Sequence, residues 1–209
     1  MKLLIVGATG GLGKELVGRA PEEGHEATVL VRYPAKLGGW GERIRVARGD
    51  VLDPASVGSA VRGQDAVVSA LGTPSPRKPS TLLQQGTANI VGAMERHAVK
   101  RLVCVTILGT GDSGRRHGSL FYRLFVLGFF VRPMLEDKER QEEVIRRSSL
   151  DWTIVRPPRY TDEPARGDYR VIADRGGRVG KIGRADLAQF MLDQLGDRRF
   201  VRKEVAVGY

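Results

Sequence analysis

The chain has 209 residues, of which 41% are hydrophobic and 28% are charged, so it is long enough to bury a core without cross-links. Its single cysteine, Cys104, excludes an internal disulfide and a multi-cysteine metal site. Its three histidines are too far apart for a clustered zinc site, and the apolar run at residues 3–6 is too short for a signal peptide. We therefore expect a metal-free, cytoplasmic protein in a reducing compartment.

The net charge of +10 is spread along the chain rather than gathered in one tail. Such a charge suits anionic small molecules, which arginine binds in bidentate geometry, and it also suits nucleic acids and membrane surfaces. No combined aromatic and basic face can be identified, so we expect no nucleic-acid partner and interpret most of the charge as a solvated surface. The oligomeric state stays open between monomer and homodimer.

Short apolar runs alternate with helical patterns along the whole chain. The apolar runs predict strands at residues 3–6, 26–31, 44–47, 65–71, 101–107, 152–155 and near 204–207. The helical patterns predict helices at residues 14–19, 81–97, 136–147 and 185–195, and one more that begins at Asp53-Pro54. A hairpin is expected around Gly176-Gly177. This alternation predicts one α/β domain over residues 1–209, with a doubly wound, mostly parallel sheet and helices on both faces.

A glycine-rich turn, Gly7-Ala8-Thr9-Gly10-Gly11-Leu12-Gly13, joins the first predicted strand to the first helix. Gly7 permits the tight turn, Gly10 lets the backbone approach a diphosphate, and Gly13 allows the helix and strand to pack closely. The helix N-terminus offers free N–H groups and a partial positive charge to the phosphates. One predicted strand precedes the turn and another follows the helix. This arrangement favours a Rossmann-type dinucleotide site over a glycine-rich turn that binds no ligand. The expected contact residues in the turn are Gly7, Thr9, Gly10, Gly11, Leu12 and Gly13.

The second predicted strand ends at Arg32, where a site that prefers NAD usually has a carboxylate. A guanidinium attracts the 2′-phosphate of NADP, whereas a carboxylate repels it, so we predict NADP(H) in preference to NAD(H). The alternative interpretation of Arg32 is a surface charge. Ligands bind at the carboxyl ends of the strands in open α/β sheets, so residues after the next two strands should also contact the cofactor. These residues are Asp50, Val51, Ala70, Leu71 and Gly72.

Several motifs resemble one branch of the atypical short-chain dehydrogenase/reductases. The turn at residues 7–13 is similar to their Gly-Ala-Thr-Gly-x-x-Gly pattern, and further similarity lies at residues 48–51, 63–68, 71–73, 89–94, 150–158 and 183–188. That branch includes biliverdin-IXβ reductase, also called flavin reductase, and NmrA-like proteins. The resemblance covers nearly the whole chain and implies an NAD(P)-binding domain. It also implies that Pro157 and Pro158 lie beside the nicotinamide.

The chain departs from the superfamily at the residues that transfer a proton. Ordinary members carry a Tyr-x-x-x-Lys pair and a serine after the fifth strand. Here Lys138 stands at the lysine position, but Met134 stands at the tyrosine position and cannot transfer a proton. Ile107 falls near the serine position, with Thr106 as a substitute. The resemblance therefore leaves Lys138 as a cofactor-binding and catalytic candidate, and Thr106 as a catalytic candidate.

Two functions of different classes remain open. A flavin, a linear tetrapyrrole or another conjugated small molecule can accept a hydride and take its proton from water. The chain would then be an NADPH-dependent reductase that only binds and orients its reactants. The other function is that of a non-catalytic NADP(H)-binding redox sensor or regulatory protein, as in NmrA-like relatives.

An aromatic and aliphatic segment at residues 119–135 lies between the fifth predicted strand and the next helix. We interpret residues 114–135 as a substrate-side insertion, in which Phe125 covers a flat ligand and Arg123 or Arg132 binds its anionic group. A core helix, a dimer surface and a helix lying on a membrane are the alternative interpretations.

Four more side chains are candidates for the substrate site. Arg77 follows the fourth predicted strand and Arg159 follows the proline turn, so either could bind a substrate anion or remain a solvated charge. Tyr160 and Tyr169 are candidates for a proton donor, and their spacing singles out neither.

Overall fold

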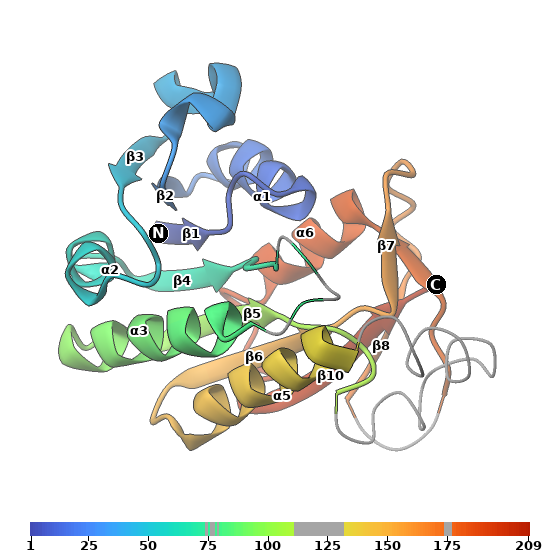
Figure 1. The fold of residues 1–209 in the computed structure, drawn as a ribbon. Coiled ribbons are helices and arrows are strands. Elements are labelled where there is room, and N and C mark those ends of the chain that lie inside the picture. The colour runs from blue at the N-terminus through green and yellow to red at the C-terminus, as the bar shows by residue number, and fades with distance from the viewer. Residues whose placement is uncertain (74, 76–77, 79, 111–131, 174–176) are drawn as a thin grey trace.

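The computed structural model describes residues 1–73, 75, 78, 80–110, 132–173 and 177–209. Eight strands form one sheet in the order β3-β2-β1-β4-β5-β6-β10-β8 (Figure 1). All neighbours from β3 to β10 pair in parallel, and β8 pairs antiparallel with β10 at one edge. The strands are β1 Lys2–Val6, β2 Glu26–Val31, β3 Arg45–Arg48, β4 Ala66–Ser69, β5 Arg101–Val105, β6 Asp151–Arg156, β8 Arg170–Ile172 and β10 Lys203–Gly208. The predicted mostly parallel α/β sheet is confirmed.

The central strands bury side chains on both faces of the sheet. In β1, Leu3 and Ile5 belong to one buried cluster, whereas Leu4 and Val6 belong to another. Both faces need a helical cover, which explains why these strands are continuous apolar runs in the sequence. One face is covered by α1 (Gly11–Glu22) and α6 (Arg184–Asp193). The other face is covered by α2 (Pro54–Val61), α3 (Leu82–Arg96) and α5 (Arg132–Arg147) (Figure 1).

Helix α2 begins where the sequence predicts, directly after Asp53. The two carboxylate oxygens of Asp53 accept hydrogen bonds from the backbone N–H groups of Ala55 and Ser56, and Pro54 occupies the first turn. This arrangement satisfies N–H groups that have no partner within the helix. It also ends the loop that leads from β3, so the residues directly after β3 stay at the carboxyl edge of the sheet.

Gly176, within the expected hairpin, lies outside the described residues, and the described strands on either side of it do not pair with each other as a hairpin requires. The strand before it, β8, pairs with β10 in the main sheet. The strand after it, β9 (Lys181–Gly183), pairs in parallel with β7 (Arg159–Thr161) in a separate two-stranded sheet. The two strands that flank the glycines therefore have different partners. The 3₁₀ helix η1 (Pro34–Glu42), which follows β2, was also not expected.

The helix expected at residues 136–147 begins earlier than predicted. It starts at Arg132, so residues 132–135 of the expected substrate-side insertion form the first turn of α5. The remainder of the expected insertion, residues 114–131, lies outside the described residues.

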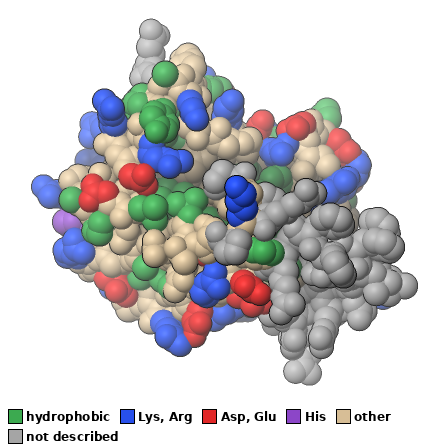
Figure 2. All heavy atoms as spheres, viewed as in Figure 1, with side chains coloured by type: hydrophobic (Ala, Val, Ile, Leu, Met, Phe, Trp, Pro, Cys, Tyr) green, Lys and Arg blue, Asp and Glu red, His purple; other side chains and the backbone are tan. Residues whose placement is uncertain are grey.

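On the face seen in Figure 2, charged side chains of both signs are dispersed rather than collected in one patch. Figure 2 shows Lys and Arg side chains around this face, with Asp and Glu side chains between them. Many of the arginines are paired locally, as Arg147 is with Glu143 and Arg199 is with Asp197. In the part of the chain that the structure describes, no helix combines the length and hydropathy needed to cross a bilayer.

Candidate functional site

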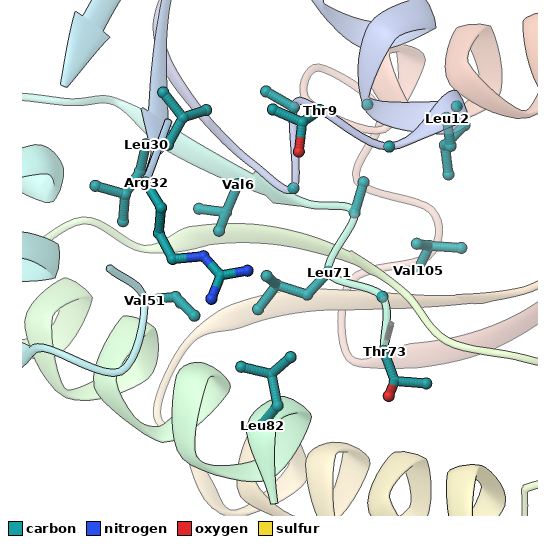
Figure 3. A pocket seen from close by; sticks show the side chains of 18 of the residues that line it. Val6, Thr9, Leu12, Leu30, Arg32, Val51, Leu71, Thr73, Leu82 and Val105 are labelled. Atoms are coloured by element: carbon teal, nitrogen blue, oxygen red, sulfur yellow. The ribbon is translucent and has the colours of Figure 1, made fainter. Parts of the chain in front are cut away.

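A cavity of about 430 Å³ opens at the carboxyl ends of the strands, where β1 and β4 lie side by side (Figure 3). The chain runs from β1 outward to β3 and then crosses back to β4, so the strand order reverses at this point. Such a reversal leaves a crevice in which open α/β sheets bind their ligands. The cavity lining includes most of the residues predicted to bind a cofactor: Gly7, Thr9, Gly10, Gly11, Leu12, Gly13, Arg32, Asp50, Val51, Ala70, Leu71 and Gly72.

At two glycines of the turn between β1 and α1, there is no room for a side chain. Gly7 has a φ of +86°, and a Cβ atom on it would lie 2.3 Å from the carbonyl oxygen of Ala70. A Cβ atom on Gly13 would lie 2.1 Å from the carbonyl oxygen of Gly7. At the start of α1, Gly10 supplies no side-chain cap, and no acidic residue stands in the first turn. The N–H groups of this turn therefore border the cavity without a competing carboxylate, which fits the diphosphate of a dinucleotide.

The strand ends of β2 and β3 contribute one cation and one anion to the cavity. The Nη1 atom of Arg32 lies 3.9 Å from Oδ2 of Asp50, and the two side chains are 58% and 39% exposed. Figure 3 shows the guanidinium of Arg32 extending into the cavity toward Val51 and Leu71. An exposed pair at this distance is weak, so the guanidinium remains able to bind an incoming anion.

The cavity lining also includes residues that follow β6 in the chain. One of the two tyrosine candidates is among them and the other is not. Tyr160 of β7 lines the cavity beside Arg184, whose Cζ atom lies 5.2 Å from the centroid of its ring. Tyr169 instead packs edge-on against Phe190 of α6, with ring centroids 5.9 Å apart. Of the two, only Tyr160 can meet a ligand in this cavity.

The two catalytic candidates lie behind the cavity wall. Lys138 is buried, and its Nζ atom donates to the carbonyl oxygens of Leu71 at 3.2 Å and Val105 at 3.3 Å, both of which are lining residues. Burial lowers the pKa of Lys138. Thr106 is also buried, and its hydroxyl donates to Glu142 at 2.6 Å. In this arrangement Lys138 supports the floor of the cavity, and the hydroxyl proton of Thr106 is already engaged.

Glu142 is the centre of a buried ionic network under the same edge of the sheet. Its carboxylate accepts hydrogen bonds from Nε and Nη2 of Arg156 at 2.9 and 2.5 Å, and from Nη2 of Arg146 at 2.8 Å. The hydroxyl of Thr110 donates to it as well, at 2.8 Å. Burial alone would raise the pKa of Glu142, but the hydrogen bonds and charge of Arg156 leave it below its ordinary value. The carboxylate therefore stays ionised and ties α5 to the ends of β5 and β6.

Comparison with known families shows the family of the chain. The family profile described as NAD(P)H-binding matches residues 7–198, which is most of the chain. The chain belongs to this NAD(P)H-binding family. Its resemblance to the atypical short-chain dehydrogenase/reductases is consistent with that membership. The glycine turn and the cavity are the parts of this NAD(P)H-binding chain that fit the cofactor.

Individual relatives have different described roles. The chain is 27% identical over 161 residues to the photosystem II assembly factor Ycf39 of Synechocystis sp., covering 74% of this chain and 44% of that protein. It is 28% identical over 155 residues to a (4-alkanoyl-5-oxo-2,5-dihydrofuran-3-yl)methyl phosphate reductase of Streptomyces griseus, covering 74% and 46%. The chain thus spans less than half the length of these relatives. Among solved structures, the anaerobillin reductase ChuY of Escherichia coli O157:H7 has the same fold, with a TM-score of 0.80, 22% identity, and 100% and 97% coverage.

Some predicted site residues of this NAD(P)H-binding chain do not line the cavity. Lys138 lies behind it, and Pro157 and Pro158 are buried just after β6, where the Pro157 carbonyl oxygen accepts a hydrogen bond from Leu108. Arg159 is exposed on β7. The predicted substrate residues Arg77, Arg123 and Phe125 lie outside the described residues. The sequence interpretation also missed several lining residues, among them Leu30, Leu82 and Arg184.

Proposed function

We propose that this chain is an NADPH-dependent reductase of a conjugated small molecule. The observation that carries the proposal is the pairing of a glycine turn without an acidic cap and an arginine at the end of β2, both in one cavity. Membership of the NAD(P)H-binding family supports the cofactor class. Arg32 supports the preference for NADP(H), because it places a positive charge where a site for NAD(H) has a carboxylate.

The chain's own residues bind and orient the reactants. When bound, the reduced cofactor supplies a hydride from its nicotinamide ring. The first turn of α1 holds the diphosphate, and the ends of β4 and β5, at Leu71 and Val105, form the floor that Lys138 braces. Met134 stands four residues before Lys138, so this position of α5 provides no proton donor. A conjugated acceptor suits such a site, because it can take its proton from water.

Two similar proteins and the net charge of the chain support one class of substrate. The Streptomyces griseus relative is named as a reductase of an oxo-dihydrofuran that carries a phosphate group, which is a conjugated anion. The ChuY neighbour is also described as a reductase. The net charge of +10 favours an anionic ligand at this chain too. We therefore propose a flavin-like, tetrapyrrole or other conjugated anion as the acceptor.

A non-catalytic NADP(H)-binding regulator is the second candidate function. The hydroxyl of Thr106 is bonded to Glu142, and Met134 replaces the tyrosine of the superfamily, so two of the usual reacting groups are missing from the cavity. The relative Ycf39 is described as an assembly factor, which supports a role other than catalysis. Both functions use the same cofactor site.

A panel of acceptors distinguishes the two functions. Purified protein is mixed with NADPH and one acceptor at a time, namely FMN, biliverdin or a simple quinone. Oxidation of NADPH is followed by its absorbance. Turnover that depends on the protein with at least one acceptor supports the reductase. Saturable NADPH binding without turnover of any acceptor would favour the regulator. Absence of saturable binding to either nicotinamide coenzyme would reject both.

Charge reversal at Arg32 tests the cofactor preference. We expect Arg32→Glu to weaken NADPH binding by about a hundredfold, because a charge-assisted hydrogen bond is replaced by repulsion of the 2′-phosphate. NADH binding should change by less than about threefold, since that ligand lacks the 2′-phosphate. Arg62→Glu, at the exposed end of α2 and outside the cavity lining, is the matched control. Equal losses for the two coenzymes in Arg32→Glu would count against this assignment.

A further inference from the structure

A second guanidinium reaches the glycine turn from the far end of the chain. Arg184 is the first residue of α6 and lines the same cavity as the turn. A Cβ atom built on Gly11 would lie 2.8 Å from Nε, 3.1 Å from Cδ and 3.2 Å from Cζ of Arg184. Gly11 is itself the first residue of α1. The guanidinium of Arg184 therefore lies directly against the backbone that is expected to hold a diphosphate.

The surroundings of Arg184 hold its side chain in place without neutralising it in a buried pair. The guanidinium packs on the ring of Tyr160 and forms an ion pair with Asp162. The side chain of Asp162 is 89% exposed, whereas that of Arg184 is 24% exposed. An ion pair with so exposed a carboxylate is weak. The Nε atom of Arg184 is buried and has no hydrogen-bond partner among the described residues, which leaves a donor to be satisfied.

We propose that Arg184 binds the diphosphate of the dinucleotide, opposite the first turn of α1, and exchanges its exposed ion pair with Asp162 for that diphosphate. Tyr160 keeps the guanidinium on the cavity side through contact with its ring. The inference deepens the proposed function, because it requires only that a dinucleotide occupies this cavity. It also gives Gly11 a reason to be glycine, since a side chain there would push Arg184 away.

The proposal assigns separate tasks to the two arginines of the cavity. Arg32 would recognise the 2′-phosphate that only NADP(H) carries. Arg184 would bind the diphosphate that NADP(H) and NAD(H) share. Loss of Arg184 should therefore weaken both coenzymes equally, whereas loss of Arg32 should weaken only one.

Two ligand fragments separate these tasks in a calorimetric titration. ADP carries a diphosphate without a 2′-phosphate, and adenosine 2′-monophosphate carries a 2′-phosphate without a diphosphate. We expect Arg184→Gln to weaken ADP binding about tenfold and to leave adenosine 2′-monophosphate within about twofold, because one charge-assisted contact is lost. Arg32→Glu should give the reverse pattern. Arg199→Gln, which removes an exposed arginine outside the cavity lining, should change neither ligand.

Two further variants keep the test decisive if Arg184→Gln folds poorly. Asp162→Asn removes the competing carboxylate and should leave ADP binding equal to or tighter than that of the wild type. Arg184→Lys keeps the charge but not the planar fork, so its affinity for ADP should fall between wild type and Arg184→Gln. Melting of each ligand-free variant checks the fold.

The failure of this inference is distinct from failure of the proposed function. Wild-type affinity for ADP in Arg184→Gln, or equal losses for ADP and adenosine 2′-monophosphate, would overturn the role of Arg184 alone. Weaker ADP binding in Asp162→Asn would also overturn it. Wild-type protein that binds neither NADPH nor ADP would overturn this inference and the proposed function together.

Discussion

Replacement of Gly13 by alanine tests the packing of the glycine turn most directly. The new methyl group would lie 2.1 Å from the carbonyl oxygen of Gly7 and 2.7 Å from Cα of Ala8, both backbone atoms that no rotamer change can move. Forcing an extra carbon into such a space costs about 3 kcal/mol, at the upper end for overpacking. Alanine gains about 1 kcal/mol over glycine inside a helix, so the net loss of unfolding free energy should be about 2 kcal/mol. For a chain of this size the melting temperature should fall by about 4–8 °C.

The matched control is Gly92→Ala, in the middle of α3. A Cβ atom there meets nothing within 4 Å, so only the helix propensity changes and stability should rise by about 0.5–1 kcal/mol. Thermal melting followed by circular dichroism gives the stabilities, and titration with NADPH gives the affinities. We expect Gly13→Ala to lose NADPH affinity by at least about tenfold, because the turn must move away from its N–H geometry. A Gly13→Ala protein as stable as Gly92→Ala, with unchanged NADPH affinity, would refute the packing argument.

Three further predictions concern the ionic network and the proton source. Glu142→Gln should lower the unfolding free energy by about 3 kcal/mol in urea titrations, because it breaks a buried pair with Arg156, whereas the exposed Glu143→Gln should cost less than about 0.5 kcal/mol. The pKa of Glu142 is lower in the folded chain than its ordinary value of 4.5, so its stabilising effect is complete above pH 4.5 and is lost as the pH falls through the folded value. The stability difference between the wild type and Glu142→Gln should therefore narrow on acidification, and a difference that widens would contradict this sign. Tyr160→Phe and the control Tyr169→Phe should both keep the rate with a conjugated acceptor within about threefold, whereas a hundredfold loss in the first alone would identify Tyr160 as a general acid.

The fold was predictable because its main signals are local. Strand β1 is an apolar run next to a glycine turn, and α2 begins at Asp53-Pro54 with the expected carboxylate cap. Such features depend on neighbours within a few residues. The pairing of β8 with β10 and of β9 with β7 depends instead on contacts between distant segments. The turn signal at Gly176-Gly177 indicated a change of direction but not the partner of either strand.

The cavity likewise combines residues that a local motif predicts with residues that only distant contacts bring together. The glycine turn and Arg32 belong to one βαβ unit, so a motif of about thirty residues places them together. Arg184 meets Gly11 only because α6 packs beside α1 on the same face of the sheet, and no spacing in the sequence encodes that contact. Thr106 was a reasonable candidate from its position after β5. Its hydroxyl is engaged by Glu142, which Arg156 holds in an ionised state from another strand.

The position of Lys138 connects the missing tyrosine to the proposed chemistry. In the superfamily pattern that this chain resembles, the lysine acts beside a tyrosine four residues earlier, and here that residue is Met134. The Nζ atom of Lys138 instead donates to the carbonyl oxygens of Leu71 and Val105, the residues just beyond β4 and at the end of β5. A buried amino group that donates to two carbonyl groups fixes the spacing of those strand ends, and hence the floor of the cavity. Among the described residues, this site keeps the lysine that braces its floor and lacks the tyrosine acid of the superfamily pattern. Under the proposed function, such a site suits an acceptor that is positioned by the chain and takes its proton from water.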